Sequence, residues 1–130
     1  MSGYSFPSHY PPNCPPSAYG EAPGVYYRLV CDPDGISSKD FLSDFDKGRR
    51  KNWEANSPCC RRCISVHSTL AGVITVWKQF QTLPRHIAEL NLNGNHGIIH
   101  PVSNNNDTHH AWWIPMGIDP CSFLVRILQE

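Results

Sequence analysis

Residues 62–80, RCISVHSTLAGVITVWKQF, constrain the fold more than any other part of this chain. Residues 63–67 have the apolar character of a buried strand. Beyond them, apolar side chains recur at the helical spacing i, i+3, i+4, i+7 and i+10. These side chains are Leu70, Val73, Ile74, Trp77 and Phe80. The pattern therefore predicts a strand that runs directly into an amphipathic helix.

Ser68 and Thr69 stand where the predicted helix begins. Hydroxyl side chains are preferred there because they accept hydrogen bonds from the unpaired amides of the first turn. Pro84 cannot continue a helix, so we expect the helix to end by about Thr82. The unpaired amides also carry partial positive charge, which makes the junction a candidate anion site. Two interpretations stay open: Ser68 and Thr69 satisfy these amides themselves, or the amides hold an anionic ligand.

The length and charge of the chain narrow its class. With 130 residues, one domain is expected. Lys plus Arg and Asp plus Glu number 11 each, so the zero net charge gives no electrostatic reason to expect nucleic acid or an anionic membrane as a partner. A short basic run, residues 47–51, is either a solvated surface or a phosphate-binding patch.

Two sequence signals, a membrane-spanning run and a secretory signal, bear on the compartment that we predict for the chain. The chain contains no run of about 18 apolar residues, so no membrane-spanning helix is expected. The N-terminus lacks the basic start and apolar segment of a secretory signal, so we predict a cytoplasmic location. The six cysteines are then expected to be thiols or metal ligands. Their even number keeps disulfides open if the chain is exported by another route.

The remaining segments predict an α+β fold. Residues 1–24 are rich in Pro, Tyr, Ser and Gly, which predicts a disordered N-terminal tail and a candidate site for a protein partner. Residues 25–130 are expected to form a single domain. Further strands are predicted at 25–31, 85–92, 97–102, 109–114 and 121–128, and a short helix begins near Ser38. Because the late strands follow one another directly, a mostly antiparallel sheet with two helices is expected.

Arg28 is the first candidate site residue. It lies in the middle of the apolar strand VYYRLVC. A buried guanidinium must be paired or must meet an anionic ligand. The alternatives are a carboxylate partner such as Asp40 or Asp44, or an edge position that reaches solvent.

The segment HHAWWI, residues 109–114, supplies further candidates. In a strand, one face carries His109 and Trp113 and the other carries His110 and Trp112. An indole offers a stacking surface, and an imidazole can donate to a ribose hydroxyl or transfer a proton. The alternative is that the tryptophans fill the core while the histidines bond to the backbone.

The cysteine cluster PCCRRC contains one CxxC pair, Cys60 and Cys63. Structural zinc sites need about four ligands and commonly combine two such pairs. Here the other ligands would come from Cys14, His67, His109 or His110. Buried thiols without a metal are the alternative to zinc at Cys60 and Cys63.

Taken together, the element order resembles a small ADP-ribosyltransferase-like domain, a split-sheet family that binds NAD. The segment VYYRLV resembles the family's first strand, and CISVHST resembles the strand whose serine supports the nicotinamide ribose. The resemblance implies that Arg28 contacts pyrophosphate or ribose and that Ser65 lies at the strand edge. It also implies that His109 or His110, with Trp112 or Trp113, lies near the reacting ring, and that Ser68 and Thr69 help to bind the cofactor.

The chain departs from the family's pattern in two places. Residues 65–69 read SVHST where the arginine-dependent branch has an S-T-S-like motif, and the chain has no E-x-E pair. Glu89 is the one glutamate in a predicted strand. The resemblance therefore implies a nucleotide ligand and possible cleavage of the nicotinamide–ribose bond. The alternatives are a zinc-supported or metal-free protein-interaction module, and a Cys–His hydrolase built on Cys63 or Cys121.

Overall fold

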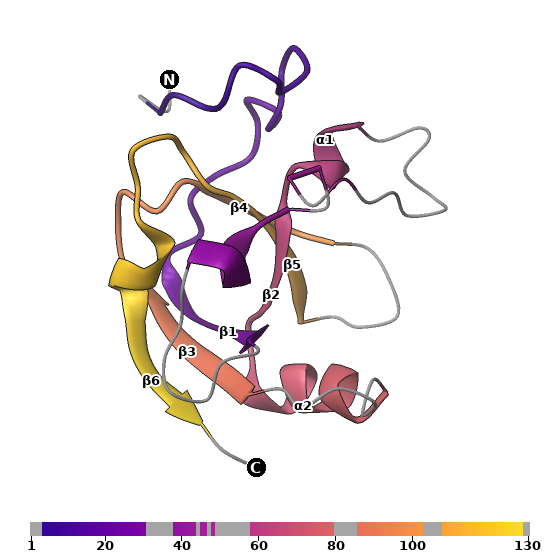
Figure 1. The fold of residues 1–130 in the computed structure, drawn as a ribbon, viewed down its shortest axis with the longest axis vertical. Coiled ribbons are helices and arrows are strands. Elements are labelled where there is room, and N and C mark those ends of the chain that lie inside the picture. Colours follow the sequence, from indigo (N-terminus) through magenta and orange to yellow (C-terminus); the bar gives the residue numbers. More distant parts are fainter. Residues whose placement is uncertain are drawn as a thin grey trace.

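The structure, a computed structural model of the chain, describes residues 4–30, 38–43, 45–46, 48, 58–79, 86–102 and 108–128. Its elements follow in chain order (Figure 1). They are β1 (Gly24–Val30), η1 (Ser38–Phe41), α1 (Pro58–Arg61), β2 (Ile64–His67), α2 (Leu70–Gln79), β3 (His86–Leu92), β4 (Ile98–Pro101), β5 (His109–Trp113), η3 (Pro120–Phe123) and β6 (Leu124–Leu128).

The strands form one sheet in the order β4-β5-β2-β1-β3-β6, and every neighbouring pair is antiparallel. Helix α2 packs against β1 and β2 (Figure 1). The predicted α+β class with a mostly antiparallel sheet and two helices is thus confirmed. β1 and β3 pair along seven positions, whereas β1 and β2 share the single register pair Tyr27 and His67. The pairing between β1 and β2 is therefore much shorter than the pairing between β1 and β3.

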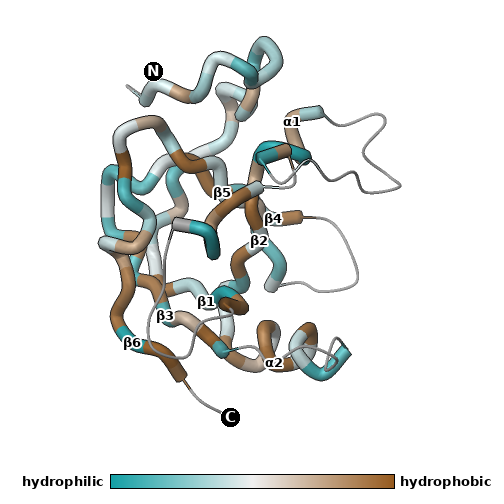
Figure 2. Tube along the Cα trace, viewed as in Figure 1, coloured by the Kyte–Doolittle hydropathy of each residue, from teal (hydrophilic) through white to brown (hydrophobic). Residues whose placement is uncertain are grey.

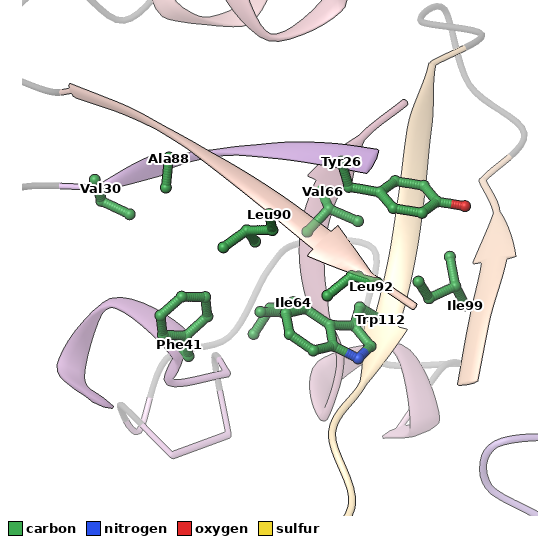
Figure 3. Close-up of a cluster of buried hydrophobic side chains, with 10 residues drawn as sticks. All are labelled: Tyr26, Val30, Phe41, Ile64, Val66, Ala88, Leu90, Leu92, Ile99 and Trp112. Atoms are coloured by element: carbon green, nitrogen blue, oxygen red, sulfur yellow. The ribbon is translucent and has the colours of Figure 1, made fainter. Parts of the chain in front are cut away.

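Alternation along the strands produces two hydrophobic clusters, because successive side chains point to opposite faces. The larger cluster gathers side chains from one face of β1, β2, β3, β4 and β5, together with Phe41 of η1 (Figure 3). Its buried members are Tyr26, Val30, Phe41, Ile64, Val66, Ala88, Leu90, Leu92, Ile99 and Trp112. The second cluster contains Cys14, Ile98, Ala111 and Trp113. Trp112 and Trp113, adjacent in β5, thus serve the two opposite faces.

The N-terminal residues 4–23 differ from the predicted disordered tail. They are mostly neutral or hydrophilic along their length (Figure 2), yet they pack against the second cluster through Tyr4, Phe6, Tyr10 and Tyr19. The Met116 amide donates to the Ser5 carbonyl at 2.8 Å. Composition alone misled here, because proline stiffness and four aromatic rings allow a segment without regular structure to pack.

A disulfide joins Cys14 to Cys59, with their Cα atoms 5.5 Å apart. The prediction that the cysteines are all thiols or metal ligands is wrong for this pair. No local pattern indicates this bond, because 45 positions separate the two residues. Cys60, Cys63 and Cys121 are free thiols, and Cys31 lies outside the described residues.

The structure differs from the sequence-based expectation at three local elements. The short helix expected near Ser38 is a single 3-10 turn that buries Phe41. Residues 58–61, expected as loop, form α1, since proline fits the first turn of a helix. The last strand begins at Leu124, because residues 120–123 form a 3-10 turn in which Asp119 accepts a hydrogen bond from the Cys121 amide.

Helix α2 begins as the capping residues predicted. The Thr69 hydroxyl accepts a hydrogen bond from the Gly72 amide at 3.0 Å. On the predicted apolar face Val73 is fully buried, while Leu70 at the start of the helix remains 37% exposed. Phe80 and the predicted end near Thr82 lie outside the described residues. The strand that leads into a capped helix is therefore confirmed up to Gln79.

Thr69→Ala removes this cap and is expected to destabilise the domain by about 1 kcal/mol. Thr75→Ala is the matched control, since the Thr75 hydroxyl bonds only the Ala71 carbonyl on an exposed turn of the same helix among the contacts described. We expect the control to be nearly neutral in urea denaturation. A Thr69→Ala midpoint equal to that of the wild type would contradict the capping role.

Candidate functional site

The candidate site lies where β1 and β2 separate. Directly after the Tyr27–His67 pair, the Arg28 side chain reaches across the gap. Its Nη1 donates to the Ser65 carbonyl oxygen at 2.6 Å, and its Nε donates to the Asp40 carbonyl oxygen at 2.8 Å. The guanidinium also lies 5.9 Å from the centre of the Phe41 ring. Arg28 therefore links β1, β2 and η1 at one point.

Ser65 connects Arg28 to His109. The Ser65 hydroxyl lies 2.8 Å from His109 Nε2, while its carbonyl oxygen accepts from Arg28. The antiparallel register between β2 and β5 places the two strands side by side at this point. The structure thus links three of the four predicted catalytic residues, Arg28, Ser65 and His109, through one serine. The register places them on two faces of the sheet, with the Arg28 side chain on one face and the Ser65 hydroxyl and His109 on the other.

His67 is buried behind this group. Its ring stacks on that of His109, with 5.3 Å between centres, and its Nδ1 lies 3.1 Å from the Thr108 hydroxyl. Burial lowers the pKa of His67 to about 4, with further lowering from His109, His110 and Arg28. His67 is therefore neutral at physiological pH. Arg28 is the permanently charged group among these neighbours, and a guanidinium favours an anionic ligand.

His110, the fourth predicted catalytic residue, points to the face of the sheet that carries Tyr26 and Arg28, away from the Ser65 hydroxyl and His109. Its Nδ1 lies 2.7 Å from the Thr108 carbonyl oxygen, and its ring meets that of Tyr26 edge-on. The structure therefore separates His110 from Ser65. This matches the alternative in which a histidine of the HHAWWI segment bonds to the backbone.

The two tryptophans are core residues. Trp112 is fully buried, and its indole N–H donates to the His96 carbonyl oxygen at 2.6 Å. Trp113 is 3% exposed, and its N–H donates to the Cys59 carbonyl oxygen at 3.0 Å. Neither indole presents an exposed face for stacking, contrary to the expectation from the sequence.

Ser68 and Thr69 are used by the fold. The Thr69 hydroxyl caps α2, and the Ser68 amide donates to the Thr108 carbonyl oxygen at 2.9 Å. Of the two interpretations of this junction, the structure shows self-capping at Thr69. We therefore do not include the helix start in the candidate site.

A pocket of about 210 Å³ opens next to the Arg28 contacts. Phe41 and Ile64 form part of its wall. Phe41 follows Asp40 and Ile64 precedes Ser65, and the carbonyl oxygens of Asp40 and Ser65 accept from Arg28. The other lining residues are Pro7, His9, Tyr10, Ser43, Asp46, Arg62, Trp112, Ile114 and Pro120. Sequence reasoning missed the polar members, because they come from segments far apart in the chain and share no motif.

Tyr10 and Arg62 fix the outer part of this pocket. The Tyr10 hydroxyl donates to the Arg62 carbonyl oxygen at 3.2 Å, and Arg62 Nε donates to His9 Nδ1 at 3.3 Å. Burial raises the pKa of the Tyr10 phenol, with a further rise from the Asp46 charge. The phenol therefore stays neutral and acts as a hydrogen-bonding group.

No metal centre can be built from the residues that the structure describes. Among them, no group of three or more His, Cys, Asp or Glu side chains has the arrangement of a metal site. Cys14 is bound in the disulfide, and the Cys63 thiol lies 3.0 Å from the Cys60 carbonyl oxygen. The predicted basic run, residues 47–51, falls on positions that are mostly outside the described part, so it adds nothing to the site.

Comparison of the chain with models of protein families, with curated proteins and with solved structures found no match. The ADP-ribosyltransferase-like resemblance therefore depends on the residues of this chain alone. Within the described ranges, no helix has the length and apolar character needed to cross a membrane.

Gly72→Ala is expected to disturb the site from the helix side. A Cβ at this position would overlap the Thr108 hydroxyl, which is the group beside His67. Overpacking of this kind costs about 1–3 kcal/mol. Gly20→Ala is the control, because a Cβ there meets nothing within 4 Å. Equal urea midpoints for the two variants would contradict the close packing of α2 on Thr108.

The depressed pKa of His67 predicts a pH dependence of stability. An unfolded histidine takes up a proton near pH 6.5, whereas folded His67 does so only near pH 4. Its stabilising contribution is complete above pH 6.5 and is lost as the pH falls toward 4, with a slope of up to about 1.4 kcal/mol per pH unit.

His67→Gln is expected to flatten this slope, because glutamine does not titrate and can still bond to the Thr108 hydroxyl. His86→Gln, at the start of β3, is the control for the same histidine-to-glutamine exchange at another strand position. The measurement is the free energy of unfolding in urea at several pH values between 7 and 4. Equal slopes in the wild type and His67→Gln would rule out His67 as the titrating group.

Proposed function

We propose that this domain binds an NAD-type dinucleotide where β1 and β2 separate. The observation that carries the proposal is the Arg28 guanidinium beside a pocket, held by the carbonyl of Ser65, whose hydroxyl contacts His109 on the other face of the sheet. A guanidinium suits a pyrophosphate, and an imidazole next to a hydroxyl suits a ribose. These are also the residues on which the resemblance to ADP-ribosyltransferase-like domains rests.

The size of the pocket limits how the ligand sits. Pockets for drug-sized ligands measure roughly 300–1,000 Å³, and this one measures about 210 Å³. It therefore takes one ring of the dinucleotide, between Phe41 and Ile64. The pyrophosphate then lies against Arg28, since both wall residues adjoin the carbonyl groups that hold Arg28.

Binding without efficient transfer is the activity that we infer. Cleavage of the nicotinamide–ribose bond develops positive charge on the sugar, which a fixed carboxylate normally stabilises. The charges that act on His67 in this site come from basic residues. Glu89 lies on β3, where its carboxylate pairs with Arg126 at 3.3 Å. The carboxylate of the pocket, Asp46, accepts hydrogen bonds from the Ser43 amide and hydroxyl, so Arg28 favours holding an anionic ligand over stabilising a cation.

Arg28→Lys tests this proposal directly. Lysine keeps the positive charge but cannot reproduce two directed N–H groups, so NAD binding should weaken roughly tenfold to a hundredfold, the value of a charge-assisted hydrogen bond. Arg126→Lys is the matched control, as its side chain is 63% exposed on β6. Titration calorimetry, with the circular dichroism spectrum as a check on folding, measures both.

Ser65→Ala provides a second variant that leaves the carbonyl contact with Arg28 in place. Loss of the bond to His109 loosens β2 where the Ser65 carbonyl holds Arg28, and is expected to weaken binding roughly fivefold. NMR of the wild type with NAD over several hours then distinguishes a binder from an enzyme, because free nicotinamide would reveal turnover. Absence of binding at millimolar NAD, or equal affinity in Arg28→Lys, would overturn the proposal.

Compartment and protein partners remain separate questions. The cytoplasmic location expected from the sequence stays a prediction, and the Cys14–Cys59 disulfide weighs against it because such bonds persist mainly in oxidising compartments. The N-terminal segment packs its aromatic rings on its own domain, and a protein partner for this segment stays a prediction. We do not extend the zinc alternative at Cys60 and Cys63, since no observation favours it over free thiols.

A further inference from the structure

Residues 4–19, called the strap below, lie across one face of β4 and β5. Four of their aromatic rings pack on the cluster formed by Cys14, Ile98, Ala111 and Trp113. Ala111 is the register partner of Ser65 in the neighbouring strand. The strap therefore covers the sheet immediately beside the serine that joins Arg28 to His109.

The strap also supplies one wall of the pocket. Pro7, His9 and Tyr10 line it opposite Phe41 and Trp112. The His9 ring stacks on Phe45 with 4.0 Å between centres and accepts a hydrogen bond from Arg62. Removal of the strap would leave the pocket open on this side.

Besides the packing of its aromatic rings and the contacts of His9 and Tyr10 with Arg62, the strap is held at three places. At its start, the Met116 amide donates to the Ser5 carbonyl oxygen. Just past its end, the Ile99 amide donates to the Gly20 carbonyl oxygen at 3.0 Å, and His96 contacts the Glu21 carbonyl oxygen. Between them, Cys14 is bonded covalently to Cys59 of α1. The disulfide is thus the central attachment, and Gly20 marks the point about which a released strap would turn.

We propose that the Cys14–Cys59 disulfide is a redox latch that holds the strap closed over the pocket. A dithiol reductant breaks the S–S bond, gives up two electrons and two protons, and leaves two cysteine thiols and an oxidised, cyclic disulfide of the reductant. The strap then detaches as far as Gly20, and the pocket loses its outer wall. Only the consequence for NAD rests on the function proposed above.

Amide hydrogen exchange measured by NMR, before and after reduction with dithiothreitol, tests the latch. Thiol titration should first show two additional thiols per chain. The Met116 amide is then expected to exchange roughly tenfold faster or more, because its acceptor belongs to the strap. The Ile99 and Val102 amides should keep their protection, since Gly20 and His109 accept from them outside the strap.

Two variants accompany this measurement. Cys14→Ser should show fast Met116 exchange without any reductant, and Cys121→Ser, which removes a free thiol elsewhere, should behave as the oxidised wild type. Unchanged Met116 exchange after confirmed reduction would overturn the latch. Loss of protection at Ile99 and Val102 together with Met116 would overturn it too, because the disulfide would then hold the whole fold.

NAD titration of the oxidised and reduced forms tests the consequence for the pocket. We expect roughly tenfold weaker binding after reduction, since three wall residues leave the site. Equal affinity in both forms would overturn control of the pocket by the strap. Binding in neither form would overturn the proposed nucleotide function, while the Met116 exchange would still decide whether the latch exists.

Discussion

The bridge formed by Arg28 is the interaction on which the centre of this structure depends. β1 and β2 share one register pair, so β4-β5-β2 and β1-β3-β6 meet across a narrow join. The guanidinium reaches across it to the Ser65 carbonyl and back to the Asp40 carbonyl. A guanidinium in a largely apolar setting is costly unless its donors are satisfied. The two carbonyl groups meet that need and fix where Ser65, η1 and the pocket lie.

The site and the fold therefore share residues. Ser65 belongs to the bridge through its carbonyl and to the histidine pair through its hydroxyl. His67 lies against His109 and Thr108, and Thr108 lies against α2 at Gly72. A change in any of these contacts is transmitted by packing, because a buried neighbour has little space to relax. This continuity explains why a helix substitution and a histidine titration both report on the same site.

Local signals in the sequence predicted much of this arrangement. The helical spacing of the apolar side chains in residues 70–77 and the capping position of Thr69 were sufficient to place β2 and α2. An arginine in an apolar strand indicated the centre of the candidate site. The Cys14–Cys59 bond and the pocket residues Tyr10 and Asp46 depend on contacts between distant segments, which no local pattern encodes. The indoles were misassigned because strand alternation gives two faces, and here both faces are buried.

The side-chain Nε–H resonances of the arginines, recorded by NMR during an NAD titration, test the central claim most directly. The account predicts that the Arg28 Nε–H exchanges slowly with solvent in the free protein, because it is bonded to the Asp40 carbonyl oxygen. It also predicts that this resonance shifts on addition of NAD while that of the exposed Arg126 does not. Rapid exchange at Arg28, or an Arg28 resonance that NAD leaves unchanged, would contradict the account.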